Sequence, residues 1–180
     1  MIYVIRHGET DYNKIGRLQG KRDISLNETG IMQAYEIKNR LYDVDFDEIY
    51  SSDLNRAYKT AEIIADGKRV IKDSRLEEIG LGRWEGQTYD FLRANDPEYV
   101  EFFNDPKNFN KGDNESYQSV IDRVKEFFDE LDNDKNILVV THGFVIYHYF
   151  QDIFPQIEPV KNCEIILYDK LNNKIIRNKK

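Results

Sequence analysis

Residues 1–13 have the sequence MIYVIRHGETDYN, and the polarity of the chain changes abruptly in the middle of this stretch. The apolar run at residues 2–5 predicts a buried β-strand. Arg6 and His7 follow that strand directly, and Gly8 comes next. A glycine lets the backbone turn closely beneath a bound group because it has no Cβ. We therefore expect the strand to carry a cation and an imidazole to its carboxyl end.

The same pattern occurs after two further apolar runs. The predicted strand at residues 46–51 is followed by Ser52 and Asp53, with Arg56 at the start of the next helix. The run at residues 137–140 is followed by Thr141, His142 and Gly143, again where a helix begins. Open α/β sheets bind their ligands at the carboxyl ends of the strands. If these strands are neighbours, two histidines and two arginines converge on one place.

Strands and helices alternate along most of the chain. Apolar periodicity predicts helices at 27–42, 54–65, 116–131 and 143–154, and strands at 2–5, 46–51, 70–71, 136–141, 163–168 and 175–176. Such alternation favours an α/β fold with a largely parallel sheet. Antiparallel additions are expected near the carboxyl terminus.

Residues 83–114 differ from this pattern. They are rich in aromatic and polar side chains, include two Asp-Pro pairs, and contain no clear strand. We interpret them as an insertion that lies over one end of the sheet, with a peripheral helical layer as the alternative. The aromatic rings would pack on a substrate ring or tail, or they would form only the core of the insertion itself; the sequence leaves both readings open.

Size and charge narrow the possible partners. The chain has 180 residues, which suits a single domain over 1–180. It holds 26 Lys and Arg against 33 Asp and Glu, a formal net charge of −7. An acidic protein repels phosphate backbones, so neither nucleic acid nor a membrane surface is an expected partner. Cys163 is the only cysteine, which excludes an intrachain disulfide and, with no apparent signal peptide, favours a cytoplasmic location.

The converging polar residues indicate a phosphate site. Arg6 and Arg56 offer planar forks that match phosphate oxygens. A helix that begins near Gly143 adds amide N–H groups and the positive end of its dipole. The sequence has no Walker-type glycine loop and no Asp, Glu or His set at obvious metal-ligand spacing. We therefore expect the arginines and histidines to neutralise the anion without a metal ion.

A histidine beside a phosphate can act as a nucleophile. Neutral His7 would attack phosphorus through one ring nitrogen, while a backbone carbonyl holds the other N–H. Arg6, Arg56 and His142 would stabilise charge on the equatorial oxygens, and water would hydrolyse the phosphohistidine. The leaving alkoxide needs a proton from a carboxylic acid, and the candidates are Glu9, Asp53, Glu77, Glu78 and Glu85. The third histidine, His148, is expected to be structural or solvent-facing.

These motifs resemble the histidine phosphatase superfamily, in its phosphoglycerate-mutase-like branch. The resemblance covers nearly the whole chain through RHGET (6–10), RLQG (17–20), LNETG (26–30), SSDL (51–54), LEEI (76–79), WEG (84–86), NES (114–116) and VVTHG (139–143). It implies a three-layer α/β/α sandwich with a small helical cap at about 83–114, and no metal or cofactor.

The resemblance also implies roles for individual residues. His7 is the residue that becomes phosphorylated, and Arg6, Arg56 and His142 form the phosphate pocket. Glu78 is the proton donor and later the base for water. Asn13, Gln19 and Gly20 would line the substrate or phosphate side, together with Gly143 at the start of its helix.

Three functions follow from this resemblance, and one is preferred. The short insertion lacks an adjacent arginine pair, and the RLQG and WEG motifs are more similar to the phosphatase side, including α-ribazole phosphatases. A phosphomonoester hydrolase for a small phosphorylated metabolite is therefore favoured. A mutase that returns the phosphoryl group to its substrate is the first alternative. A non-catalytic module that binds a phosphorylated ligand is the second.

Overall fold

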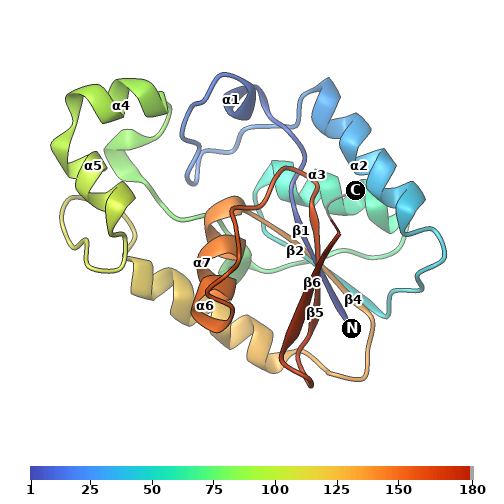
Figure 1. Ribbon diagram of the computed structural model, residues 1–180. Helices are drawn as coiled ribbons and strands as arrows, with labels where there is room; N and C mark the ends of the chain where they lie inside the picture. The colour runs from blue at the N-terminus through green and yellow to red at the C-terminus, as the bar shows by residue number, and fades with distance from the viewer. Residues whose placement is uncertain (179–180) are drawn as a thin grey trace.

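The computed structural model describes residues 1–178 and is built around one six-stranded sheet (Figure 1). The strand order is β3-β2-β4-β1-β5-β6. The strands are β1 (Ile2–Arg6), β2 (Glu48–Ser51), β3 (Ile71–Lys72), β4 (Ile137–Thr141), β5 (Ile165–Asp169) and β6 (Lys174–Asn178). The first four run parallel, whereas β5 and β6 are antiparallel additions. The predicted sheet, including its antiparallel end, is confirmed.

Helices cover both faces of the sheet. Figure 1 shows α2 (Glu28–Arg40) and α3 (Asn55–Ala65) on one side, and α6 (Tyr117–Glu130) and α7 (Gly143–Ile153) on the other. The observed ends differ from the expected ones by only a few residues, and the three-layer α/β/α sandwich is confirmed. Within residues 1–178, no helix is both long and apolar enough to cross a membrane.

The strand β4 contributes side chains to the two hydrophobic cores, one on each face of the sheet. Successive side chains of a strand point to opposite faces. Ile137 and Val139 accordingly join the core under α6 and α7, while Leu138 and Val140 join the core under α2 and α3. All four are fully buried. A central strand with helices on both faces therefore needs the continuous apolar run that the sequence has here.

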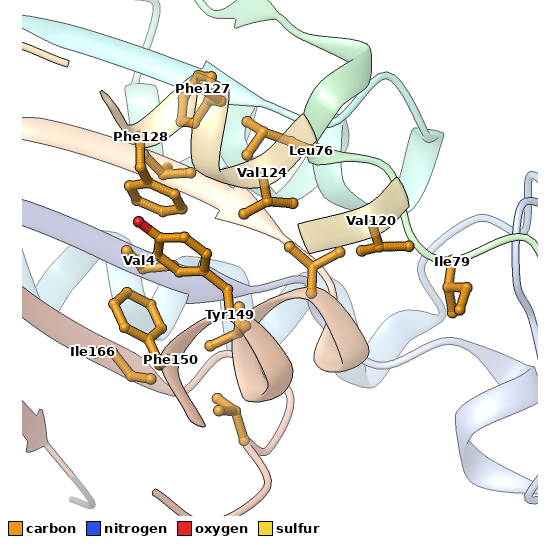
Figure 2. Close-up of a cluster of buried hydrophobic side chains, with 14 of the residues drawn as sticks. Val4, Leu76, Ile79, Val120, Val124, Phe127, Phe128, Tyr149, Phe150 and Ile166 are labelled. Atoms are coloured by element: carbon orange, nitrogen blue, oxygen red, sulfur yellow. The ribbon is translucent and has the colours of Figure 1, made fainter. Parts of the chain in front are cut away.

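The larger core lies between the sheet and helices α6 and α7 (Figure 2). Phe127 and Phe128 of α6 and Tyr149 of α7 are buried there, and the Phe128 and Tyr149 rings stack with centroids 4.6 Å apart. This packing fixes α7 against the sheet. It therefore also fixes the position at which the first residues of α7 meet the strand ends.

Strand register brings the predicted polar residues to one edge. Arg6, the last residue of β1, is paired with Thr141, the last residue of β4. Ser51, the last residue of β2, is paired with Val140. The His7 N–H donates to the Thr141 carbonyl oxygen over 3.0 Å. The residues that follow all three strands therefore meet at a single carboxyl edge.

The start of β5 lies two residues later than expected. Cys163 has a φ of 53°, in the left-handed region, and its N–H donates to the Arg6 carbonyl oxygen at 2.9 Å. A residue in that conformation cannot continue an extended strand. The segment before β5 thus serves to hold the end of β1, and the strand begins only at Ile165.

Residues 83–114 contain two short helices, α4 (Tyr89–Asn95) and α5 (Pro97–Asn104), which stand together at one end of the molecule (Figure 1). Asp96 caps α5 by accepting from the Tyr99 N–H at 3.0 Å, with Pro97 at the first helical position. Proline suits that position because its missing N–H has no helical partner there. The Asp-Pro pair is therefore a helix start, and we call residues 83–114 the cap segment.

Candidate active site

A cavity of about 500 Å³ opens at the carboxyl edge of the sheet. The predicted site residues that line it are Arg6, His7, Asn13, Gln19, Gly20, Arg56, Glu78 and Gly143. His142 is completely buried beside the cavity, with its ring centroid 5.2 Å from that of His7. Residues from the strand ends, the start of α7 and the loops between elements thus converge as the sequence predicted.

The His7 ring is held in one orientation by the backbone. Its Nδ1 lies 2.7 Å from the Gly8 carbonyl oxygen. That oxygen can only accept, so Nδ1 carries the proton and Nε2 keeps its lone pair. The Gly8 N–H in turn donates to the Thr60 hydroxyl at 3.0 Å. The geometry therefore leaves one nucleophilic nitrogen, on the opposite side of the ring from its carbonyl partner.

Gly8 lies in close contact with the backbone of another segment. A Cβ at this position would lie 2.5 Å from the Gly30 carbonyl oxygen. The absence of a Cβ at Gly8 therefore allows close packing against the first turn of α2. Gly30 faces the same restriction, since its Cβ would lie 2.1 Å from the Glu9 carbonyl oxygen.

Electrostatics keep His7 neutral. Burial lowers its pKa well below the usual 6.5, and the charges of Arg56 and Arg6 lower the pKa further. Burial and the Arg56 charge lower the pKa of His142 in the same way. A neutral imidazole is the form that can act as a nucleophile, so at neutral pH His7 is in its reactive state.

The two arginines are held by backbone carbonyls. Arg6 Nη1 donates to the Val160 carbonyl at 2.7 Å. Arg56 Nη1 and Nη2 donate at 2.8 Å to the carbonyls of Arg22 and Gly20. Burial lowers the pKa of Arg56 to about 10, which leaves its guanidinium charged at neutral pH. Both cations are therefore fixed in position by carbonyl oxygens, and the charge of Glu78 acts on both of them.

Three buried nitrogen atoms at this site have no hydrogen-bond partner: Nε of Arg6, Nε of Arg56 and Nδ1 of His142. Across residues 1–178 only five buried side-chain nitrogen or oxygen atoms are in this condition, and a fourth, Nδ1 of His148, also belongs to a residue that lines the cavity. An unsatisfied buried donor costs about 1–3 kcal/mol. Their concentration in one place indicates a site for a group that accepts several hydrogen bonds at once, and a phosphoryl group has the necessary oxygens.

The His142 ring is also oriented by a neighbour. Its Nε2 lies 2.8 Å from the hydroxyl oxygen of Ser52, which itself accepts from the Leu54 N–H at 3.3 Å. A hydroxyl that accepts from an amide can donate its own proton to a ring nitrogen. This assignment places the imidazole proton on Nδ1, which is the nitrogen without a partner. His142 would then be a donor toward a bound anion.

One of the five candidate carboxylates lines the cavity, namely Glu78. Its two oxygens accept from the N–H groups of Ile79, at 3.1 Å, and Phe144, at 3.3 Å. Burial raises the pKa of the Glu78 carboxyl above its usual value, although Arg56 and these N–H groups oppose the shift. A carboxyl group with a raised pKa is suited to donate a proton.

The other four carboxylates have different surroundings. Glu85 accepts from the N–H groups of Lys21 and Leu81, and Glu9 accepts from the Asn27 side chain. Glu77 forms an ion pair with Lys21, and Asp53 is exposed to solvent. These contacts assign them to loop structure and to the surface.

Asn13, Gln19 and Gly20 lie on the loop side of the cavity. The Gln19 side-chain oxygen accepts from the Thr10 hydroxyl at 2.9 Å, and the Asn13 side-chain oxygen accepts from the Thr10 N–H at 3.2 Å. Because these contacts use the oxygen atoms, the two NH₂ groups are the donors available to a ligand.

Comparison with known proteins agrees with this geometry. The family model of the histidine phosphatase superfamily (branch 1) matches residues 2–166. The chain belongs to the histidine phosphatase superfamily.

Three members of the superfamily illustrate its range. The chain is 34% identical over 151 residues to "Probable phosphoglycerate mutase GpmB" of Erwinia tasmaniensis, covering 81% of this chain and 70% of that one. It is 35% identical over 147 residues to "Phosphoserine phosphatase 1" of Hydrogenobacter thermophilus, covering 78% and 70%. A "putative alpha-ribazole-5'-P phosphatase" of known structure from Escherichia coli K-12 has a TM-score of 0.82 at 26% identity, covering 98% and 93%.

Beyond the superfamily motifs, the structure adds residues to the site. The Asn162 side chain donates to the His7 carbonyl oxygen at 2.9 Å and so supports the nucleophile loop. His148, which the sequence predicted to be structural or solvent-facing, lines the cavity instead, next to Phe144 at a ring distance of 4.0 Å. The sequence contained a signal for this position. Phe144 and His148 are four residues apart on a helix that begins at the site, so they lie on the same face of that helix.

Among residues 1–178, the structure contains no group of three or more His, Cys, Asp or Glu side chains arranged to hold a metal ion.

Proposed function

We propose that this protein is a metal-independent phosphomonoester hydrolase that acts through a phosphohistidine on a small phosphorylated metabolite. One observation carries the proposal: three buried nitrogen atoms without a partner, from Arg6, Arg56 and His142, lie at the same site as a neutral His7 whose Nε2 is unprotonated. A phosphoryl group would satisfy the three donors and place its phosphorus before the nucleophile.

In the first half-reaction, the lone pair of His7 Nε2 attacks phosphorus while the bond from phosphorus to the ester oxygen breaks. Protonated Glu78 gives its proton to that oxygen, so the product leaves as a neutral alcohol. The arginines and His142 stabilise the negative charge on the oxygens that remain on phosphorus.

In the second half-reaction, the Glu78 carboxylate takes a proton from water, whose oxygen attacks phosphorus. The phosphorus–nitrogen bond breaks, its electron pair returns to Nε2, and inorganic phosphate leaves. Glu78 is protonated again and His7 is neutral again, so the cycle closes without any other reactant.

α-Ribazole 5'-phosphate is the specific substrate candidate, supported by the RLQG and WEG motifs and by the name of the Escherichia coli structure. In this scheme residues 83–114 form a cap over the substrate, within one domain of residues 1–180. A cytoplasmic location, which suits a soluble metabolite, belongs to the same proposal.

The contacts of the cap segment favour the hydrolase over a mutase. A mutase must hold a second anionic group of its substrate while the phosphoryl group returns. Arg83 pairs with Asp96 and Glu98, Lys107 with Asp152, and Lys111 with Glu101. These three cations are therefore already neutralised by side chains of the protein, and the other basic residue of the segment, Arg93, lies over the Phe103 ring and does not line the cavity.

Phosphate release in the presence of EDTA tests the proposal. The panel contains an aryl phosphate, 3-phosphoglycerate, phosphoserine, sugar phosphates and α-ribazole 5'-phosphate, with the His7→Ala variant as the blank. We expect release that EDTA leaves unchanged and that His7→Ala abolishes. Release that survives in His7→Ala would refute the phosphohistidine. Isomerisation of phosphoglycerate without free phosphate would support the mutase, and tight binding without turnover would support the binding module.

A further inference from the structure

The cavity has two chemically different ends. The end at the strand edge carries the polar residues described above. The rest of its lining, which we call the far end, is mainly apolar and aromatic and includes Phe103 of the cap segment and the rings of Phe144 and Tyr147 of α7. A phosphate held at the polar end would therefore direct the rest of its substrate toward an apolar wall.

The aromatic side chains of the cap segment divide into two groups. The Trp84 ring packs against the rings of Tyr99, Phe102 and Phe109, with centroids 5.3–5.6 Å apart. All four are buried and form the core of the cap segment, and two of them, Tyr99 and Phe102, also line the cavity. Phe103 and Tyr89, in contrast, are 52% and 36% exposed although both line the cavity. These two rings have apolar surface left to cover a ligand.

Among residues 1–178, no charged side chain lines the far end, and the charges that reach His148 belong to Lys107 and Asp152, which pair with each other. His148 is the one ionisable imidazole there, and burial lowers its pKa to about 4, so the ring is neutral at pH 7. The guanidinium of Arg93 lies 4.7 Å from the centroid of the Phe103 ring, but Arg93 is exposed and does not line the cavity. A carboxylate buried at this end would lose its hydration without gaining a counter-ion, which is costly.

We infer that the group esterified to the phosphate is an uncharged alcohol or phenol with a ring or an apolar body, which packs between Phe103 and Phe144. The inference rests on the proposed function and narrows it. Phosphoserine and 3-phosphoglycerate, each with a carboxylate close to the phosphate, are then poor ligands, even though the names of related proteins refer to serine and glycerate phosphates.

Binding to the His7→Ala variant tests the inference without requiring turnover. Calorimetric titration would compare 1-naphthyl phosphate with phosphoserine and 3-phosphoglycerate. We expect the naphthyl ester to bind at least about tenfold more tightly, because apolar contacts and an unpaired carboxylate each have effects of that size. Equal or tighter binding of either carboxylate ester would overturn the inference, as would an absence of naphthyl phosphate binding.

Two exposed phenylalanines of the cap segment provide a matched pair of variants. Phe103 lines the cavity, whereas Phe91 on α4 is equally exposed, at 54%, and does not. In the His7→Ala background, Phe103→Ala should weaken naphthyl phosphate binding about fivefold and Phe91→Ala should leave it unchanged. Equal effects of the two variants would contradict the inferred contact.

A substitution of Arg93 tests whether this residue binds a carboxylate of the substrate. If Arg93 recognised a substrate carboxylate, Arg93→Gln would weaken phosphoserine binding, and the inference would be wrong. We expect no change. If the wild-type protein bound naphthyl phosphate but released no phosphate, the result would count against the proposed hydrolase alone. Failure of the proposed function and failure of the inferred substrate class are therefore distinguishable.

Discussion

Ser52 and His142 are joined by a hydrogen bond of 2.8 Å that links the end of β2 to the end of β4. The bond occupies Nε2 of the imidazole, while Nδ1 is buried without a partner. A serine that the motif pattern placed only at a strand end thus contacts the imidazole directly, and when its hydroxyl donates to Nε2 the ring proton lies on Nδ1. Hydrogen bonds behind a reactive imidazole commonly select its tautomer in this way.

The Ser52→Ala substitution should lower kcat about tenfold, since it removes one buried hydrogen bond that holds the donor form of His142. Steady-state kinetics with an aryl phosphate would measure the loss. The matched control is Ser51→Ala, because the Ser51 hydroxyl is also buried but donates to the Ser52 carbonyl oxygen and not to His142. A similar loss in both variants would indicate a general packing defect and not control of the tautomer.

Glu78→Gln should lower kcat by about 10²–10⁴ for an alkyl phosphate, because a glutamine cannot protonate the leaving oxygen. The loss should be smaller for 4-nitrophenyl phosphate, whose leaving group needs little protonation. Glu77→Gln is the neighbouring control, since Glu77 forms an ion pair with Lys21 outside the cavity. If Glu78→Gln slowed both esters equally, Glu78 would not be the proton donor.

Acid should destabilise the protein partly through His148. Burial lowers the pKa of His148 from 6.5 to about 4, so between those pH values the unfolded chain binds more protons than the folded one. Stability then falls as the pH drops through this range, by up to about 1.4 kcal/mol per pH unit for one proton. His148→Phe should flatten the slope of unfolding free energy against pH in urea titrations. A slope identical to wild type would show that the ring takes up no proton on unfolding.

The convergence of the site could be predicted because it depends on local patterns. Apolar runs end at Arg6, Ser52 and Thr141, and the rule for open sheets places strand ends together. The observed pairing of Arg6 with Thr141 is the register that this rule needs. The backbone acceptor for the His7 ring also followed from the chemistry required of the nucleophile, and the structure supplies it at Gly8.

The choice among the carboxylates could not be made from such patterns. The loop that carries Glu78 is held by Arg123 of α6, which donates to the Arg75 carbonyl at 2.6 Å and to the Glu78 carbonyl at 3.3 Å. Its guanidinium is paired in turn with Glu115. These contacts join residues 45 and 48 positions apart, so only tertiary packing determines that Glu78, and not Glu77, faces the cavity. Which rings of the cap segment are buried and which stay exposed depends on packing in the same way.

Inorganic phosphate or vanadate should stabilise the folded protein, because either anion can accept from the partnerless N–H groups of Arg6, Arg56 and His142. A ligand at 100 times its Kd adds about 2.7 kcal/mol to the unfolding free energy. Thermal unfolding measured with phosphate, and with sodium chloride at equal ionic strength, would separate specific binding from screening. His142→Ala should reduce the phosphate-induced shift, since it removes one of the three donors. An equal shift with chloride, or a full shift in His142→Ala, would contradict the proposed phosphate pocket.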